Sequence, residues 1–353
     1  AGGGKARVFA TLNPAGMDLR DWRRLGIAED FARRQLEVIE ALSAMGAVPA
    51  CSCTPYLIGV RPGRGEHLAW SESSAVSYAN SVLGAQTNRE DGPSALAAAI
   101  TGRTARYGLH LPENRLADTV VEVHCPVESE ADYGALGYLV GKQIGNAIPF
   151  FRGLDSSRPE GPAPAATETK LRALGAAMAA SGAVALYHVD GVTPESRDGN
   201  MLRPDARVIT IDSLEAGYAA LNTTPLADVD LVSVGCPHAS RDEILEIADW
   251  LRGKHVVTRL WVTTARATKE AVQSAVETIE AAGGLVVADT CLVVAPVEAL
   301  GVRRLATNSA KAAFYTPGHS HIDVRFGTLA QCLETAVSGR WPGGPARGSE
   351  KSA

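Results

Sequence analysis

Residues 229–264 of this 353-residue chain read VDLVSVGCPHASRDEILEIADWLRGKHVVTRLWVTT. The apolar runs at 229–234 and 259–264 predict two buried strands, and the amphipathic stretch at 240–252 predicts a helix between them. Ser240, followed three residues later by Glu243, is typical of a capped helix start. Two strands joined by a helix of about 12 residues indicate a βαβ unit, and such units build parallel sheets.

The same alternation extends in both directions, so we expect an α/β fold with parallel sheets flanked by helices. The further predicted strands are 6–11, 120–124, 183–188 and 285–288, and the further predicted helices are 29–45, 134–144, 167–180 and 269–282. Residues 153–165 are rich in Pro, Gly and Ser, which indicates a boundary. We therefore expect two intimate lobes, 1–155 and 165–340, and a flexible tail or linker at 341–353.

Composition excludes several classes of protein. The chain is 46% hydrophobic with a net charge of -5, which allows a large core and gives no long basic run for nucleic acid. No apolar run approaches the roughly 20 residues of a membrane span. The start, Ala-Gly-Gly-Gly-Lys, lacks the apolar region of a secretory signal and an initiator Met, so we expect a processed or truncated cytoplasmic enzyme.

Residues 53–108 are unusual because they are rich in Gly, Ser, Asn, Arg and Glu. Such density of small polar residues within an otherwise apolar chain predicts a substrate cavity. A long surface loop is the alternative. Interleaved apolar residues that need burial, such as Val76, Val82 and Leu83, argue against that alternative.

The chain has six cysteines and no CxxC pair, so a thiol metal site would need ligands from distant segments. Cys236 and Cys291 each follow a predicted strand, and Cys53 follows an apolar stretch of the sequence. Because ligands bind beyond the carboxyl ends of parallel strands, these three thiols are predicted to meet at one edge. Thiolates suit iron–sulfur clusters, although any cysteine can instead be a core residue. We expect that core role for Cys51, Cys125 and Cys332, and Cys51 is the hardest to exclude as a ligand.

Polar residues near these cysteines are candidates for catalysis and binding. Glu66 and His67 are predicted acid–base groups, or else a buried polar pair. Lys311 is predicted to bind an anionic group or to cap a helix end, and His238 to bond a cluster sulfide or substrate, or to order its turn. The predicted substrate-binding residues are Ser71, Ser73, Thr87, Asn88, Arg89, His238 and Ser309. The weaker candidates are Arg103, read as a surface ion pair, and His319 and His321, read as structural residues on one strand face.

Several blocks resemble the aconitase X family: CTPYL at 53–57, GEHLAWSESSAV at 65–76, ANSVLGAQTNRE at 79–90, YHVDGVTP at 187–194, GCPH at 235–238, DTC at 289–291 and TNSAK at 307–311. The resemblance runs in order from residue 11 to about 341. It implies an aconitase-like fold and an iron-dependent dehydratase, with Cys53, Cys236 and Cys291 binding an iron–sulfur cluster or iron. It also implies a catalytic serine on a small swivelling domain or subunit, and we recognise no such domain in this chain.

Within this family, two small hydroxylated acids are plausible substrates. The Ala/Arg/Gly-heavy composition favours the bacterial reaction, the dehydration of cis-3-hydroxy-L-proline. The alternative enzyme is a mevalonate-phosphate dehydratase, which predicts a strongly basic pocket. The alternative from another class is a non-catalytic iron–sulfur or metabolite-binding subunit.

Overall fold

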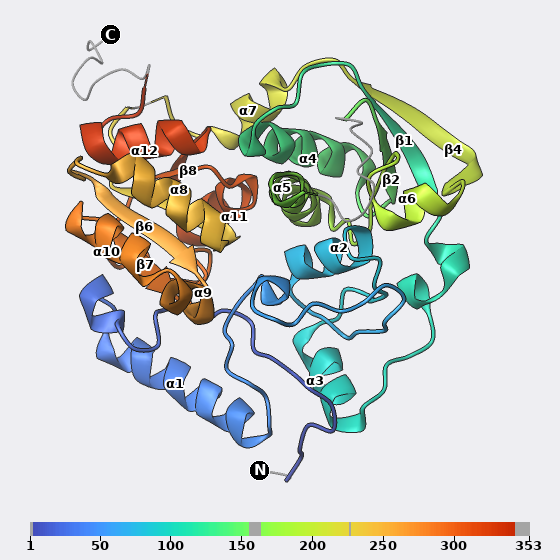
Figure 1. The fold of residues 1–353 in the computed structure, drawn as a ribbon, viewed down its shortest axis with the longest axis horizontal. Coiled ribbons are helices and arrows are strands. Elements are labelled where there is room, and N and C mark those ends of the chain that lie inside the picture. Colours follow the sequence, from blue (N-terminus) through green and yellow to red (C-terminus); the bar gives the residue numbers. More distant parts are fainter. Residues whose placement is uncertain (1–2, 155–163, 226, 343–353) are drawn as a thin grey trace. The chain divides into compact units, whose positions relative to one another are not determined.

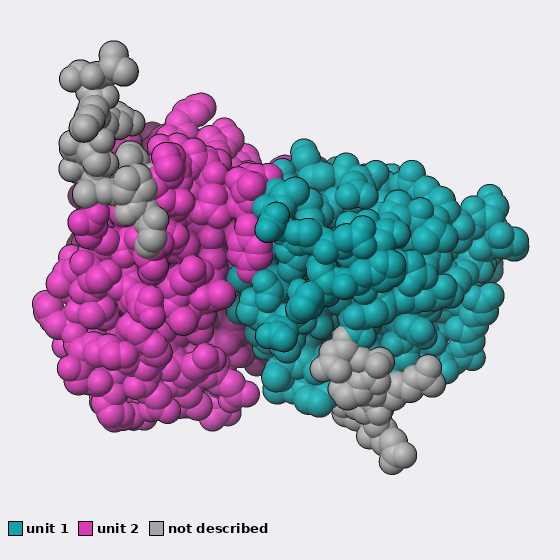
Figure 2. Space-filling view, turned by 90° about the horizontal axis from the view of Figure 1, so that it is seen from above, with its two compact units in different colours: residues 1–10, 59–217 teal, residues 11–58, 218–353 magenta. Residues whose placement is uncertain are grey.

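The computed structural model describes residues 3–154, 164–225 and 227–342. The chain forms two compact units, one of residues 1–10 and 59–217 and the other of residues 11–58 and 218–353, called unit 1 and unit 2 here (Figure 2). No helix of the described residues is long and apolar enough to cross a membrane.

Unit 1 contains a four-stranded parallel sheet of order β3-β2-β1-β4. Its strands are β1 (Ala117–Val123), β2 (Pro149–Arg152), β3 (His188–Val189) and β4 (Leu202–Ile211). Its helices are α2 (Ser73–Ser81), α3 (Gly92–Thr101), α4 (Glu130–Ile144), α5 (Ala165–Gly182) and α6 (Pro194–Asp198), with short 3₁₀ turns η3 (Gly108–His110) and η4 (Pro112–Asn114). The division between the units falls within α7 (Glu215–Leu221).

Unit 2 contains a five-stranded parallel sheet of order β7-β6-β5-β8-β9. Its strands are β5 (Leu231–Ala239), β6 (Arg259–Thr264), β7 (Leu285–Ala288), β8 (Arg304–Thr307) and β9 (Asp323–Phe326). Its helices are α1 (Glu29–Ala44), α8 (Arg241–Leu251), α9 (Arg266–Ala271), α10 (Gln273–Ala281), α11 (Ala310–Ser320) and α12 (Leu329–Ser338), with turns η1 (Trp22–Leu25) and η2 (Pro55–Leu57).

The βαβ reading of residues 229–264 is confirmed. Strands β5 and β6 pair in parallel and α8 connects them. The capping box is also present, because the Glu243 backbone N–H donates to the Ser240 hydroxyl and the Ser240 N–H donates to the Glu243 carboxylate. Apolar residues of these elements, including Val232, Ile244 and Leu260, form one buried core.

The boundary predicted at 153–165 is not where the compact units divide, and residues 155–163 lie outside the described part. Helices α4 and α5, on either side of it, lie side by side in unit 1 (Figure 1). Their backbones touch, because a Cβ on Gly137 would stand 2.6 Å from the Leu174 carbonyl oxygen. The prediction is wrong because the composition of residues 153–165 indicated only a loop. The helices before and after that loop pack against each other in the same unit.

Several elements differ from their predicted bounds. Residues 6–11 form no strand, since only Thr11 makes an isolated bridge, to Val48. The helix predicted at 269–282 is broken at Val272 into α9 and α10, and only His188 of the predicted strand 183–188 lies in β3. His321 is the left-handed C-cap of α11, so the strand face predicted for it is wrong.

The predicted tail starts at residue 341, but Trp341 belongs to the fold of unit 2. Trp341 is buried in the core of unit 2, and its backbone N–H donates to the Ala227 carbonyl at 2.6 Å. The rest of that prediction, residues 343–353, lies outside the described residues.

Candidate functional site

The segments that carry the three candidate cysteines all belong to unit 2. Cys236 lies at a register shift near the carboxyl end of β5, and Cys291 follows the carboxyl end of β7. Cys53 comes from the stretch 11–58, which joins unit 2 through hydrogen bonds such as Cys291 N–H to the Ala15 carbonyl at 2.9 Å. The expected gathering at one sheet edge therefore involves an N-terminal segment as well as two strand ends.

His238 connects the segments of all three cysteines. Its backbone N–H donates to the Sγ of Cys53 at 3.2 Å, and its ring Nε2 lies 2.8 Å from the Thr290 carbonyl oxygen. Because a carbonyl only accepts, Nε2 carries the hydrogen, and Nδ1 accepts from the Ser52 hydroxyl at 3.3 Å. His238 stands two residues after Cys236, and Thr290 precedes Cys291, so one buried residue joins the loops. Both ring nitrogens are engaged within the protein, which favours the loop-ordering reading of His238.

Cys51 and Cys53 are two residues apart but differ chemically. Cys51 is completely buried, and burial followed by the negative charge of Asp289 raises the pKa of its thiol to about 12. A thiol with that pKa stays protonated near neutral pH, and the thiolate is the form that binds metal. Cys53 is also buried, but its Sγ accepts the backbone N–H of His238, and a hydrogen bond donated to sulfur stabilises negative charge there. These contacts favour Cys53 over Cys51 as a ligand.

The donor set of Cys53, Cys236 and Cys291 fits an iron–sulfur cluster in its chemistry. Cys236 and Cys291 are partly exposed residues. Within the described ranges, no three or more His, Cys, Asp or Glu side chains are arranged to hold a single metal ion. Cysteine thiolates are the usual ligands of iron–sulfur clusters.

A buried charge cluster, which we did not predict, holds the Cys291 loop. The Arg266 guanidinium contacts both Asp18 and Asp289, two residues before Cys291. Burial alone would raise the pKa of Asp18, but N–H groups of Asp21, Arg20 and Ala288 and the charge of Arg266 lower it. Burial raises the pKa of Asp289, which accepts one backbone N–H, from Leu19. The sequence signals for this cluster were Asp289, in the DTC block at 289–291, and Asp18, within the resemblance that begins at residue 11.

Arg266→Met is expected to destabilise unit 2 by about 3 kcal/mol, because it leaves two buried carboxylates unpaired. Urea unfolding followed by circular dichroism measures this loss. The matched control is Arg252→Met, which removes an exposed ion pair with Asp249 and should cost less than about 1 kcal/mol. Equal effects of the two substitutions would contradict a supporting role for the cluster.

Two further candidates follow the carboxyl end of β8. The Ser309 hydroxyl accepts the Ala312 N–H and so caps α11. Lys311 is largely buried in the first turn of that helix. A cation at a helix N-terminus is unfavourable with the helix dipole, so Lys311 does not cap a helix end. Anion binding remains our proposal for it.

In unit 1, the two polar blocks at 66–70 and 86–90 run side by side. Gln86 N–H donates to the Glu66 carbonyl at 2.8 Å, Leu68 N–H to the Gln86 carbonyl at 2.9 Å and Glu90 N–H to the Trp70 carbonyl at 3.0 Å. The structure thus brings together the backbone of five predicted residues. They are Glu66, His67, Thr87, Asn88 and Arg89.

The side chains of these five residues are used differently. Thr87 is fully buried and its hydroxyl donates to the Asn88 carbonyl. The Asn88 amide accepts the Leu109 N–H and donates to the Tyr107 carbonyl. The exposed Glu66 carboxylate accepts the Gly63 N–H. The side chains of Thr87 and Asn88 therefore stabilise the local backbone, whereas the residues His67 and Arg89 are exposed.

The two serines of the same region lie at the start of α2. Ser73 is its first residue, Ser71 precedes it by two, and both are half-buried. Glu72 between them is the N-cap, and its carboxylate accepts the Ala75 N–H at 2.7 Å. Helix α2 itself is almost completely buried. Residues 74–90 are therefore largely packed, whereas most residues of 59–67 and 91–107 are exposed, so the segment 53–108 is only partly a surface loop.

Arg115 is a buried cation of unit 1 that sequence reasoning missed. It is 1% exposed and forms a bidentate pair with Glu195 at 2.6 and 3.0 Å. It also donates to both the side-chain and backbone oxygens of Asn80. The Asn80 amide in turn exchanges two hydrogen bonds with the backbone of Thr87. Arg115 therefore helps to hold the segment 86–90 in place, because its hydrogen bonds fix Asn80 and Asn80 binds the backbone of Thr87.

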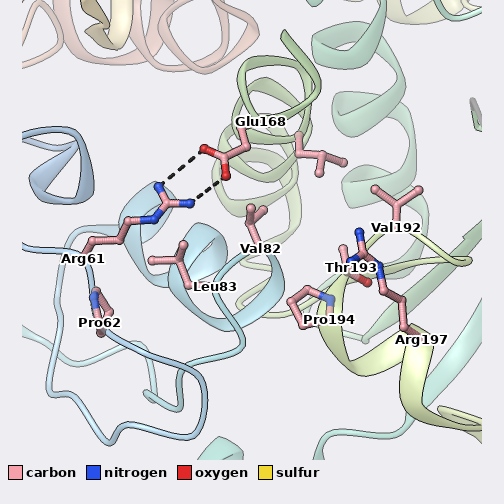
Figure 3. A pocket seen from close by; sticks show the side chains of 10 residues that line it. Arg61, Pro62, Val82, Leu83, Glu168, Val192, Thr193, Pro194 and Arg197 are labelled. Carbon is pink, nitrogen blue, oxygen red and sulfur yellow. Dashed lines mark hydrogen bonds and ion pairs between the residues drawn. The ribbon is translucent and has the colours of Figure 1, made fainter. Parts of the chain in front are cut away.

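A separate cavity of about 240 Å³ lies in unit 1 (Figure 3). The side chains that line it include apolar Val82, Leu83 and Val192 and the ion pair between Arg61 and Glu168 at 2.6 Å. None of the residues predicted to bind substrate lines this cavity. Four of its lining residues, Arg61, Pro62, Val82 and Leu83, do come from the segment 53–108 that is predicted to form a substrate cavity.

Comparison with known families gives three matches in order. Residues 1–113 match the model described as aconitase X first domain, residues 117–219 the aconitase X second domain and residues 229–338 the aconitase X third domain. Together these matches cover nearly the whole chain.

Comparison with individual proteins also finds relatives of the aconitase X family. The phosphomevalonate dehydratase large subunit of Methanothermobacter thermautotrophicus is 54% identical over 92% of this chain and 79% of that protein. The cis-3-hydroxy-L-proline dehydratase of Hypocrea jecorina is 38% identical over 96% of this chain and 58% of that protein. The crystal structure of Thermococcus kodakaraensis aconitase X in its holo-form matches with a TM-score of 0.84 and 43% identity, over 95% of this chain and 82% of that one.

Proposed function

The chain belongs to the aconitase X family, and from this premise we propose that it is the large subunit of a phosphomevalonate dehydratase. Such an enzyme is a hydro-lyase, which removes water from a small hydroxylated acid. The observation that carries the proposal is the 54% identity with a phosphomevalonate dehydratase large subunit, against 38% with a cis-3-hydroxy-L-proline dehydratase.

This choice reverses the preference drawn from composition. The Ala/Arg/Gly-heavy content favoured cis-3-hydroxy-L-proline, but composition averages over the whole surface and core and carries no information about a pocket. Identity over nearly the full chain includes the residues around the site. It therefore weighs more, and phosphomevalonate becomes the first substrate to test.

We propose Cys53, Cys236 and Cys291 as the ligands of an iron–sulfur cluster. When bound, a cluster held by three protein thiolates supplies a Lewis-acid iron with an open position for the hydroxyl that leaves. His238 orders the three loops through its bonds to Cys53 and Thr290. Lys311, buried after β8, is proposed to bind an anionic group of the substrate.

A partner chain completes the proposal. Relatives such as the Methanothermobacter protein are named large subunits, and the name implies a small one. We propose that a small aconitase X subunit supplies the base that takes the proton from the carbon next to the hydroxyl-bearing carbon. Loss of that proton and of the hydroxide yields an alkene and one water, so no oxidant or reductant is needed.

The test is to load the chain anaerobically with iron and sulfide, add a candidate aconitase X small subunit and assay alkene formation. Phosphomevalonate is expected to turn over with a kcat/KM more than about 100-fold above that of cis-3-hydroxy-L-proline, because a site built for a phosphate rejects a substrate that lacks one. The chain alone serves as the control and should be inactive. Preferential turnover of cis-3-hydroxy-L-proline would restore the composition-based choice. No turnover of either substrate by the loaded complex would favour a non-catalytic subunit.

A further inference from the structure

Two histidine rings of unit 1 meet nitrogen to nitrogen. The Nδ1 atoms of His67 and His110 are 2.8 Å apart, and the ring planes are tilted by 33°. At this distance one hydrogen must lie between the nitrogens, because two lone pairs would repel and two N–H groups would collide. The pair therefore has two possible neutral arrangements, which differ in which ring donates.

The surroundings of the rings differ, and this difference selects one arrangement. His110 is 5% exposed, and its Nε2 is buried without a hydrogen-bond partner. If His67 donated, the hydrogen of His110 would sit on Nε2 as a buried unpaired N–H, which is rare and costly. If His110 donates, its Nε2 is bare, and the hydrogen of the exposed His67 sits on an Nε2 that water can reach.

His110 is also fixed in place. It ends the turn η3, whose Leu109 N–H donates to the Asn88 side chain at 2.8 Å and whose Gly108 carbonyl accepts from Asn114 at 3.0 Å. A Cβ on Gly108 would stand 2.2 Å from the Asn88 side-chain oxygen, so only glycine allows the turn to approach Asn88 this closely. Burial, and then the charge of His67, lower the pKa of His110, which keeps that ring neutral near pH 7.

We propose that His110 is a positioning residue that donates its Nδ1–H to His67 and holds His67 in the tautomer with hydrogen on Nε2. His67 then offers an N–H donor, suited to a carboxylate or phosphate oxygen of the substrate, and it is not a neutral base at Nε2. The part about the substrate rests on the proposed function, whereas the tautomer does not. The sequence predicted an acid–base role for His67. The inference restricts that role to donating a hydrogen bond from Nε2–H to a substrate oxygen.

The tautomer is read directly from multiple-bond ¹H–¹⁵N correlation spectra of the full chain labelled with ¹⁵N-histidine at neutral pH. The signals are assigned with His67→Gln and His110→Gln. We expect a protonated Nε2 and a bare Nδ1 for His67, and the reverse for His110. In His110→Phe, which keeps a ring of similar size, the His67 signals should move to values averaged over both tautomers. A protonated Nδ1 on His67 in the unsubstituted chain would overturn the proposal.

Kinetics of the loaded complex with the small subunit test the donor role. His67→Phe removes the donor and is expected to lower kcat/KM for phosphomevalonate about 10- to 100-fold, as for a lost hydrogen bond to a charged group. His67→Gln keeps an N–H at a similar position and should recover much of that loss. Equal losses would refute donation to substrate. Because the spectra need no turnover, an inactive complex would sink the proposed function and leave the tautomer assignment standing.

Discussion

Replacing Cys236 by Ser is expected to lower the affinity of the chain for iron by more than about 100-fold while the fold persists. Serine has nearly the same size, but its hydroxyl stays protonated and is a hard donor that suits iron–sulfur clusters poorly. Removing groups that only orient a metal ligand already costs about 10- to 100-fold, so removing a ligand should cost more. Iron content and visible absorbance after anaerobic reconstitution measure the effect.

The matched control for this change is Cys51→Ala. Cys51 lies two residues from Cys53, is fully buried and stays a thiol, so its loss should leave iron content unchanged. Cys53→Ser and Cys291→Ser should behave like the Cys236 variant. Full iron retention by Cys236→Ser, or iron loss by Cys51→Ala with retention by Cys53→Ser, would show that the ligand assignment is wrong.

Replacing Arg115 by Met is expected to reduce the free energy of unfolding by about 3–5 kcal/mol, because it leaves the Glu195 carboxylate unpaired inside unit 1. A typical domain has only about 5–15 kcal/mol in total, so this variant should lose a large share of its stability. The change also removes the donors that hold Asn80. Urea unfolding and the rate of limited proteolysis both report the loss.

Two further variants separate the buried pair from a general effect of removing arginine. Arg152→Met removes a partly exposed pair with Glu122 and should cost less than about 1 kcal/mol. Arg115→Met combined with Glu195→Gln should be less damaging than Arg115→Met alone, since no buried charge is left unpaired. A stability of Arg115→Met within about 1 kcal/mol of the unsubstituted chain would mean that water reaches Glu195 and that the network contributes little.

The sequence by itself determined the local elements and the family. Apolar runs and helical periodicity predicted β6 and β7 to the residue and α8 with its Ser240 cap, because a strand or a helix start depends on residues a few positions apart. The ordered blocks indicated the aconitase X family, which the comparisons confirm. The same local reading was wrong at 6–11, because apolar residues alone do not supply a pairing strand.

Only the tertiary structure decided which distant segments belong together. It placed residues 11–58 in unit 2 with the carboxyl ends of β5 and β7. It also determined the partners of His238, Arg266 and Arg115, which lie from 23 to 248 residues away along the chain in the contacts described. Such partners are fixed by the packing of whole elements, and a buried charge or imidazole carries no periodic signal that would reveal them. The sequence could propose the three cysteines as ligands, but it could not predict the hydrogen bonds that join their loops.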